Sequence, residues 1–500
     1  MPRFYVENFG CRATQADGAA IERQFEQAGL DRAAVPSQAE IVVLNTCTVT
    51  ASADRDARAA IRRIQRENPQ CRIVVTGCYA QRAPEEIVAL PGVAQVIGNS
   101  HKHELANIAL ANSNGFVPLG VLSGTESQSQ EPNAERPIFV SDIFAHTELL
   151  AAPVFDAANE RTRPNLKVQD GCDNRCSFCV IPYVRGQSRS LPLERVLKEI
   201  DALVAAEYRE VVISGINLGR WGRDLNDREA ANCNDNHVAI PSAATDLQFS
   251  SRQTTADSLS HPLLGMTTIE ADCRGKLSFE YLVRAILDRT SLEKLRISSV
   301  EPMDWTDSFI QLVAESPRIA KHAHVPMQSG SDRVLRAMHR KYRPWHYREK
   351  IEKIHGAMPS AAIGADVMVG FPGETDSDFE QTRRMVEELP FTYLHVFTYS
   401  ARPGTPAASM NNQVPVQVAR ERNHVLRELA GEKKLGFMQS FVGRQVQAIT
   451  LNVFDGDYTE ALTDNYLKLR LRGFHSPNQW MAAQVEQVVD GALLGAIAQS

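Results

Sequence analysis

Short apolar runs alternate with longer amphipathic segments over residues 1–112. The runs have the composition of strands, and the segments between them place alanine and isoleucine at helical spacing. Strands are expected at 3–10, 40–47, 72–78 and 94–98, and helices at 14–30 and 51–68. Alternating strands and helices with short connections predict an α/β domain built on a doubly wound parallel sheet.

The same alternation returns at residue 164 and continues to residue 410. Strand-like runs alternate there with amphipathic helices, which is typical of a partial (β/α)6 barrel. These strands are expected at 166–170, 210–215, 294–300, 322–328, 362–370 and 392–400. Ligands of such barrels bind at the carboxyl ends of the strands, so the residues that follow each strand are the candidates for chemistry.

The remaining segments lack this alternation. Residues 113–163 are polar and are interpreted as a linker with an edge strand at 137–144, and residues 411–440 as a connecting helix. Residues 224–276 are rich in serine, threonine, asparagine and aspartate, and are interpreted as a flexible insertion rather than a further metal site. Residues 441–500 contain short strands separated by turn residues, which predicts a small C-terminal β-barrel.

Composition changes this picture little. Of the 500 residues, 43% are hydrophobic and 23% are charged, which are ordinary values for globular domains. The formal net charge is −6, so a surface that binds nucleic acid would have to be a local basic patch. The chain has no signal-peptide pattern and no apolar run long enough for a bilayer. We therefore expect a cytoplasmic protein, whose nine cysteines serve as ligands or buried thiols rather than disulfides.

One polar loop after the first expected barrel strand carries Cys172, Cys176 and Cys179 in a CxxxCxxC spacing. Three thiolates so close together can hold three irons of a cubane iron–sulfur cluster and leave the fourth iron open for chemistry. If the amino and carboxylate groups of S-adenosylmethionine chelate that iron, an electron can break a carbon–sulfur bond. The carbon radical released can take hydrogen from unreactive C–H groups. The alternatives are a zinc site, which prefers four ligands in paired spacings, or three unrelated core cysteines.

Three more cysteines follow strands of the N-terminal sheet. Cys11, Cys47 and Cys78 lie just after the three longer strands, at the edge where open α/β sheets bind ligands. We interpret them as ligands of a second cluster, and the alternative is three buried thiols. Cys71 precedes its strand, so about 23 Å of extended chain separates it from Cys78. We therefore expect Cys71 to be a structural thiol.

Seven motifs follow one another along the chain: NTCTVT, TGCYAQ, DGCDNRCSFC, SGINLGRWG, ISSVEP, PMQSGSD and VGFPGET. Together with the two cysteine trios they resemble the radical S-adenosylmethionine methylthiotransferases, over nearly the whole chain except the linker and residues 224–276. The resemblance implies two 4Fe–4S clusters, S-adenosylmethionine as a cofactor, and a C-terminal TRAM domain, which is an RNA-binding module. NTCTVT, TGCYAQ and PGVAQVIGN are most similar to the branch that acts on threonylcarbamoyladenosine in tRNA.

The resemblance also implies roles for single residues. The loop trio matches the ligands of the radical-generating cluster, and the N-terminal trio matches those of an auxiliary cluster that carries or delivers sulfur. The cofactor-binding residues would be Phe178, Gly215, Asn217, Ser299, Glu301, Gln328, Val369, Gly370 and Phe371. Among these, the segment 214–217 is similar to the part beside the methionyl group, and 369–374 to the loop against the adenine. Each has a structural alternative, because strand-to-helix turns carry glycine, serine and proline simply to turn and cap.

Basic residues give weaker signals of RNA binding. Arg58, Arg62 and Arg66 recur on one face of a helix, and the segment 336–343 is a second basic cluster. Arginine forks match phosphates, but an ordinary solvated helix face is an equally good interpretation. In the C-terminal segment, three basic residues alternate on one strand face: Lys468, Arg470 and Arg472.

The function implied by the resemblance is methylthiolation of carbon 2 of N6-threonylcarbamoyladenosine next to the anticodon. The partners would be tRNA and an external electron donor of the flavodoxin or ferredoxin type, and the enzyme would act as a monomer. Isopentenyladenosine in tRNA and a ribosomal protein are alternative substrates. A non-catalytic iron–sulfur electron carrier or RNA-binding protein is the alternative from another class. The open iron and the ligand segments at several strand ends argue against it.

Overall fold

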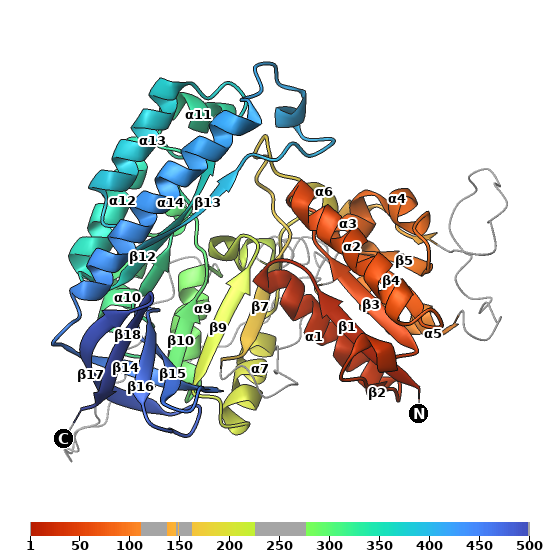
Figure 1. Ribbon diagram of the computed structural model, residues 1–500, viewed down its shortest axis with the longest axis horizontal. Coiled ribbons are helices and arrows are strands. Elements are labelled where there is room, and N and C mark those ends of the chain that lie inside the picture. The colour runs from red at the N-terminus through yellow and green to blue at the C-terminus, as the bar shows by residue number, and fades with distance from the viewer. Residues whose placement is uncertain (1, 112–137, 147–148, 150–162, 226–276, 499–500) are drawn as a thin grey trace, which may run out of the picture.

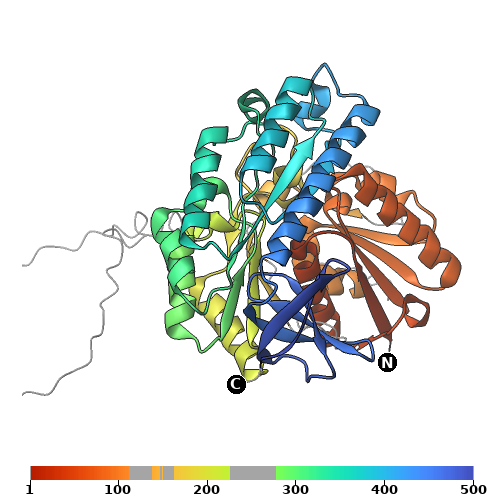
Figure 2. The ribbon, with the colours of Figure 1, turned by 60° about the vertical axis from the view of Figure 1, so that its left-hand side comes forward.

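The structure is a computed structural model that describes residues 2–111, 138–146, 149, 163–225 and 277–498. It comprises an N-terminal α/β unit, a central barrel and a C-terminal β-barrel that lies beneath the central one (Figures 1 and 2). Most of the polar linker and of the expected insertion lies outside the described residues. Within the described part, no helix is long and apolar enough to cross a membrane.

The N-terminal unit is a six-stranded parallel sheet in the order β2-β1-β3-β4-β5-β6. Its strands are β1 (Arg3–Asn8), β2 (Asp31–Arg32), β3 (Ile41–Thr46), β4 (Arg72–Gly77), β5 (Val93–Gly98) and β6 (Ile138–Phe139). The edge strand expected at 137–144 is confirmed as β6, whereas the two-residue β2 was not expected. Every residue of β3 is buried, as a central strand covered on both faces requires.

Helices cover both faces of this sheet, which confirms the doubly wound arrangement. They are α1 (Arg12–Gln27), α2 (Ala51–Glu67), α3 (Cys78–Arg82), α4 (Pro84–Val88) and α5 (Leu105–Ala111). On one face Phe25 of α1 and Leu105 of α5 pack into a single apolar cluster. On the other face Ile61 of α2 and Ile87 of α4 pack into a second cluster.

The central unit has its six main strands in chain order, as expected for a partial barrel. They are β7 (Asn165–Asp170), β9 (Glu210–Gly215), β10 (Lys294–Ile297), β11 (His322–His324), β12 (Ala362–Val369) and β13 (Tyr393–Thr398). Strands β10-β9-β7 and β11-β12-β13 form two parallel groups, which a parallel bridge between Ser299 and His324 joins. A short strand that was not expected, β8 (Arg189–Ser190), pairs antiparallel with β7.

Amphipathic helices surround these strands. They are α6 (Ile181–Arg185), α7 (Leu193–Ala205), α9 (Phe279–Arg289), α10 (Asp307–Glu315), α11 (Asp332–Ala337), α12 (Pro344–Ala357), α13 (Asp376–Glu388) and α14 (Val416–Gln439). Helix α14 is the expected connecting helix, but it does more than connect. Its Leu426 is fully buried in the barrel core, so α14 forms part of the outer helical layer.

The C-terminal unit is a closed barrel in the order β14-β15-β16-β18-β17, as expected for this segment. Its strands are β14 (Gln445–Phe454), β15 (Tyr458–Thr463), β16 (Lys468–Arg472), β17 (Trp480–Val489) and β18 (Ala492–Ile497). Along β16, Leu469 and Leu471 point into the core between outward basic residues. Closure leaves no long unpaired strand edge.

The β15–β16 turn inserts into the floor of the central barrel, which is the end where its strands begin. Tyr466, in the left-handed region at φ 70°, places its ring 4.9 Å from the ring of His322. The buried guanidinium of Arg296 lies 5.1 Å from the same Tyr466 ring and donates to Glu210 at 2.6 Å. Arg296 also donates to the carbonyl of Thr463 at 3.4 Å. A buried ion pair thus joins two barrel strands and the C-terminal turn.

Substituting Glu210 by alanine should lower the free energy of unfolding by about 3–5 kcal/mol, since it leaves the buried cation of Arg296 without its partner. Urea unfolding followed by circular dichroism measures the change. The matched control is Glu194→Ala, which breaks an exposed pair with Arg289 and should leave the unfolding midpoint unchanged. Equal midpoints for wild type and Glu210→Ala would contradict the structural role of the pair.

Candidate active site

The loop that follows β7 brings Cys172, Cys176 and Cys179 together. Backbone hydrogen bonds fix it at both ends, from Cys172 N to Gly186 O at 3.1 Å and from Ser177 N to Met338 O at 3.2 Å. Burial, together with the nearby charges of Cys176 and Cys172, raises the pKa of the Cys179 thiol to about 12. The three thiols therefore lie within electrostatic range of one another.

Their chemistry fits a multi-iron cluster better than a single ion. Among the described residues, no three cysteine, histidine or acidic side chains are close enough to share one metal ion. The thiolates of a cubane bind three different irons and so lie farther apart than the ligands of one zinc. Three cysteines on one loop fit a cubane cluster with one open iron.

The N-terminal trio also converges. Cys11 caps the start of α1, Cys47 follows β3 directly, and Cys78 is the first residue of α3. Burial raises the pKa of Cys47 to about 12, and the charges of Cys78 and Cys11 contribute in the same direction. Gly10, at φ 117°, is required there, because a Cβ would lie 2.7 Å from that of Cys47. The position of each cysteine directly after a strand predicted that the three would lie at one edge of the sheet.

Cys71 lies at the opposite end of β4, as expected. It is buried in the apolar cluster beneath α2. Burial raises the pKa of its thiol. It is therefore a structural thiol.

Helix α6 contacts the N-terminal trio. Cys78 packs in a small apolar cluster against Val180, which caps the start of α6, and Val184 near its end. The side chain of Asn99 donates to Cys78 Sγ at 3.6 Å and to the carbonyl of Val184 at 2.7 Å. Because α6 directly follows the cysteine loop, the second trio contacts the segment that carries the first.

A buried ion network fixes the N-terminal unit against β7. Asp17 of α1 accepts from Lys102 Nζ at 3.0 Å, from Arg185 Nη2 at 3.0 Å, and from Lys167. Asp170 accepts from Arg185 at 2.9 Å and from Lys167 at 2.8 Å. Burial opposes the charge of Asp17, but the cations, Lys102 foremost, lower its pKa to about 2. Two carboxylates and three cations therefore join four segments without leaving an unpaired charge.

A second buried carboxylate, that of Asp54, also joins the N-terminal unit to the central barrel. Asp54 of α2 accepts from Arg82 Nη2 at 3.1 Å and from Arg402, which follows β13. The backbone of Ala51 donates to Ser400 Oγ at 3.0 Å in the same contact. Sequence reasoning missed both networks, because a single charged residue within a helical pattern usually lies on the solvated face.

The residues after β9 contact the cysteine loop directly. Asn217 Nδ2 donates to Cys172 Sγ at 3.5 Å, and the Asn217 backbone donates to Gln169 Oε1 at 2.7 Å. A Cβ on Gly215 would lie 2.9 Å from the side chain of Gln169, so glycine permits this close approach. Ser214 Oγ and Asn217 Oδ1 are buried and have no hydrogen-bond partner among the described residues.

The residues after β11 and β12 form the opposite wall. Gln328 adopts φ 63°, and its buried Oε1 has no partner in the described structure. Val369 is fully buried, and the N–H of Gly370 donates to Glu374 Oε2 at 2.6 Å. A Cβ on Gly370 would lie 2.6 Å from that of Ala419, so the turn requires glycine.

Aromatic side chains close this wall against the cysteine loop. Phe371 contacts the edge of Phe178 with ring centroids 6.5 Å apart, and contacts Tyr399 at 5.7 Å. Ser299 lies at the end of β10, beside the bridge to β11. Buried polar atoms without partners are rare in folded proteins. Those at these strand ends fit a ligand that carries amino, carboxylate, ribose and adenine groups, as S-adenosylmethionine does.

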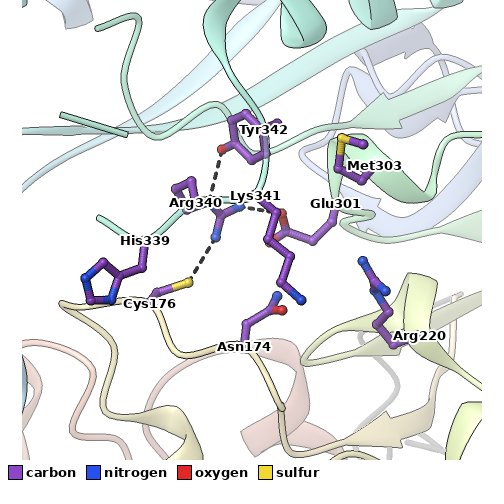
Figure 3. Close-up of a pocket in the computed structure, with 9 residues that line it drawn as sticks. All are labelled: Asn174, Cys176, Arg220, Glu301, Met303, His339, Arg340, Lys341 and Tyr342. Carbon is purple, nitrogen blue, oxygen red and sulfur yellow. Dashed lines mark hydrogen bonds and ion pairs between the residues drawn. The ribbon is translucent and has the colours of Figure 1, made fainter. Parts of the chain in front are cut away.

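Arg340 connects the cysteine loop to Glu301 (Figure 3). Its Nη1 donates to Cys176 Sγ at 3.4 Å, its Nη2 donates to Glu301, and its Nε donates to Tyr342 Oη at 3.2 Å. Glu301, Arg340 and Tyr342 line a pocket together with Asn174, Cys176, Arg220, Met303, His339 and Lys341. The interpretation of 336–343 as a phosphate-binding patch is therefore wrong for Arg340, which is only 8% exposed.

The structure does not bring the candidate RNA-binding residues together. Those of α2 belong to the N-terminal unit and those of β16 to the C-terminal barrel. Arg58 donates to Tyr79 Oη at 2.7 Å, whereas Arg62 and Arg66 are exposed. Lys468 is also exposed, Arg470 pairs with Asp455, and Arg472 pairs with Glu486 at 3.0 Å. Their role in RNA binding stays a prediction.

A three-cysteine loop after the first strand of a partial parallel barrel defines a radical S-adenosylmethionine protein. The radical SAM superfamily model matches residues 166–240 and 264–386, and the model of the uncharacterized protein family UPF0004 matches residues 3–98. Proteins of this class use a 4Fe–4S cluster and S-adenosylmethionine. The chain belongs to the tRNA methylthiotransferase family of this class.

The relatives that place it there align over most of their length. The threonylcarbamoyladenosine tRNA methylthiotransferase of Bacillus subtilis is 34% identical over 93% of this chain and 89% of its own. The enzyme of that name from Aquifex aeolicus is 30% identical over 94% of this chain and 96% of its own. The tRNA-2-methylthio-N(6)-dimethylallyladenosine synthase of Thermobifida fusca is 32% identical over 89% and 77%.

A solved structure resembles the chain in fold alone. The radical S-adenosylmethionine methyltransferase TsrM from Kitasatospora setae aligns with a TM-score of 0.52. The alignment covers 82% of this chain and 74% of that one, at 14% sequence identity. It agrees with the α/β architecture expected from the sequence.

Substituting Arg340 by glutamine should lower the reduction potential of the cluster at the loop trio by on the order of 100 mV. The guanidinium lies 3.4 Å from Cys176 Sγ, and a cation there stabilises the more negative reduced state. A redox titration followed by electron paramagnetic resonance measures the shift. Arg340→Lys, which keeps the charge, should shift the potential less. A potential unchanged in Arg340→Gln would exclude this role.

Proposed function

We propose that this chain methylthiolates carbon 2 of N6-threonylcarbamoyladenosine next to the anticodon of tRNA. The observation that carries the proposal is the contact of Cys78 with α6, because it puts a second cysteine trio beside the radical-generating loop. Replacing an aromatic C–H by a C–S bond needs hydrogen removal on one side of the base and an activated sulfur on the other. The packing of Cys78 against Val180, the residue that follows Cys179, supports two trios at one site.

The loop trio would hold the cluster to which S-adenosylmethionine binds. A cluster there would supply the electron that cleaves a carbon–sulfur bond of S-adenosylmethionine, and the carbon radical released could take hydrogen from an unreactive carbon. Asn217 and Arg340 donate to the sulfurs of Cys172 and Cys176, so they orient the loop and stabilise negative charge on it.

The N-terminal trio would hold a second 4Fe–4S cluster that carries or delivers sulfur. Supporting this, the three cysteines come from three strand ends, and Gly10 makes room beside Cys47. Arg185 lies near Cys78 and Cys11, so its cation would offset the negative charge of a cluster with thiolate ligands.

The strand-end candidates would hold the cofactor on the barrel side. Glu301 and Ser299 would bond the amino group or ribose hydroxyls, and the turn at Val369 and Gly370 would lie against the adenine. Phe178 and Phe371 exclude water from that contact through their edge-to-face packing. Glu301 is held in place by its ion pair with Arg340.

The remaining assignments concern partners. We propose that the C-terminal barrel is a TRAM-like RNA-binding domain for tRNA, aided by the exposed arginines of α2. An external flavodoxin- or ferredoxin-like protein would supply electrons. We place the enzyme in the cytoplasm with its tRNA substrate and expect it to act as a monomer.

The substrate branch is tested in a deletion strain. We expect loss of the methylthio form of threonylcarbamoyladenosine from bulk tRNA, measured by mass spectrometry of nucleosides, and recovery when the gene is restored. The favoured branch has several relatives of that name, at 30–34% identity. An intact level together with loss of methylthio-isopentenyladenosine would instead assign the chain to the branch of the dimethylallyladenosine synthases.

The two cysteine trios should have different functions. Cys176→Ala should abolish reductive cleavage of S-adenosylmethionine, because it removes a ligand of the cluster that receives the electron. Cys11→Ala should leave cleavage largely intact and stop sulfur insertion. Chromatography of 5′-deoxyadenosine and of methylthiolated RNA, from anaerobically reconstituted protein, measures both products. Cys71→Ala is the matched control, since that thiol is remote from both trios. Equal loss of cleavage in Cys176→Ala and Cys11→Ala would refute the division.

A further inference from the structure

Arg12 lies one residue after Cys11 and begins α1. Its side chain is half-buried and donates from Nη2 to Tyr466 Oη at 2.9 Å. Five buried arginines are paired with acids: Arg185 with Asp170, Arg296 with Glu210, Arg340 with Glu301, Arg402 with Asp54 and Arg422 with Glu374. The buried Arg189 differs from them and donates to the backbone carbonyls of His146 and Arg185. Arg12 has no carboxylate within ion-pair distance in the described part of the chain. Its phenol contact leaves the positive charge uncompensated.

A polar wall of the central barrel lies beside this guanidinium. It consists of inward residues of β11, β12 and β13, whose rings contact one another: His324 and His395 at 5.4 Å, and Tyr393 and His395 at 5.4 Å. Tyr466, whose hydroxyl accepts from Arg12, has its ring centroid 6.5 Å from that of Tyr393, which places Arg12 close to the wall. Burial lowers the pKa of His395, and the charges of His324 and Arg12 contribute in the same direction. His395 is exposed, so the wall is accessible.

An unpartnered polar atom in this wall also points to a ligand. His324 is 9% exposed, and its Nε2 has no hydrogen-bond partner in the described structure. The same Nε2 lies 3.4 Å from Asp366 Oδ1, which is within ion-pair distance when the imidazole is protonated. Nε2 therefore faces a carboxylate without a hydrogen bond, and a polar group of a ligand can bond to it. Arg12 and the wall together thus offer one cation and groups that can donate and accept hydrogen bonds.

The wall lies at the right depth below the cofactor candidates. Thr398 of β13 pairs with Val369, which begins the proposed adenine loop. His395 is three residues earlier on the same strand, or about 10 Å deeper in the barrel. A purine held with its reacting carbon near the strand ends can therefore extend a substituent down to His395. Arg12 reaches the same space through Tyr466, which it contacts at 2.9 Å and whose ring lies 6.5 Å from that of Tyr393.

We propose that Arg12 binds the carboxylate of the threonylcarbamoyl substituent and is a specificity-determining residue of this enzyme. An arginine fork matches a carboxylate with two parallel hydrogen bonds. The hydroxyl and ureido N–H groups of the substituent face His324 and Asp366. A dimethylallyl group has no polar atom to offer and would leave the charge of Arg12 uncompensated. This inference rests on the proposed function, because it assumes that the substrate base carries an acidic substituent.

A backbone phosphate of the RNA is the competing anion. Arg12 lies between the N-terminal unit, the barrel wall and the C-terminal turn, with Tyr466 Oη on its guanidinium. A phosphate on a folded stem-loop more readily meets exposed arginines such as Arg62. The enclosed position of Arg12 therefore favours the substituent of a base that has been turned out of the RNA.

The test measures binding without turnover. Reconstituted protein without S-adenosylmethionine is titrated with two anticodon stem-loop RNAs that differ only in carrying threonylcarbamoyladenosine or adenosine, and fluorescence anisotropy gives both dissociation constants. Wild type should bind the modified RNA tighter by about tenfold or more. Arg12→Gln should abolish this preference and leave the affinity for the adenosine RNA unchanged. Arg12→Lys should retain part of the preference.

Two further variants guard against indirect effects. Tyr466→Phe removes the hydrogen bond to Arg12 but keeps the cation, and should keep the preference. Arg384→Gln removes an exposed arginine of α13 and should behave as wild type in both titrations. An iron count on each variant shows that the cysteine trios still assemble.

Equal weakening of both RNAs by Arg12→Gln would assign the residue to a phosphate and overturn the proposal. Unchanged binding of both RNAs would reduce Arg12 to a structural contact. Equal binding of both RNAs by wild type would overturn the proposal even if the enzyme methylthiolates the modified one. Turnover of an isopentenyladenosine RNA alone would instead overturn the proposed function, and the binding titrations would still report on Arg12.

Discussion

The arrangement of the active site depends on the buried carboxylate of Asp17. It lies on the N-terminal helix α1, yet its cations come from the short helix η2 (Asn99–Glu104), from the first barrel strand and from α6. Removing Asp17 would leave the buried cation of Lys102 without its acidic partner, which is far more costly than losing an exposed pair. The network therefore holds the N-terminal sheet in one position against the barrel. That position sets the separation of the two cysteine trios.

Reaction at one carbon of a base requires such fixed geometry, because reacting atoms must approach to about 3–3.5 Å. The two halves of the site reach it by different means. On the barrel side, Asn217 and Arg340 hold the loop through its sulfurs. On the sheet side, backbone turns at strand ends place Cys11, Cys47 and Cys78, and Gly10 supplies the room between them.

Much of the fold could be predicted from local sequence patterns, because strand runs, helical spacing and cysteines at strand ends are properties of neighbouring residues. The expected parallel sheet, the six barrel strands, the C-terminal barrel and the structural role of Cys71 were of this kind. Arg340 was not, because only folding brings it to Cys176, 164 residues earlier in the chain. The pairing of Asp17 with Arg185 spans 168 residues and carries no periodic signal. Strand β8 was missed because two residues are too short to show alternation.

Tyr466 at the β15–β16 turn connects the C-terminal barrel to the other two units. Its ring lies on His322 and under Arg296, and its hydroxyl accepts from Arg12 of the N-terminal unit. The C-terminal barrel therefore contacts both the N-terminal unit and the central barrel through this one side chain. Replacing the C-terminal barrel of this chain by another would therefore require a turn that keeps the contacts with His322, Arg296 and Arg12.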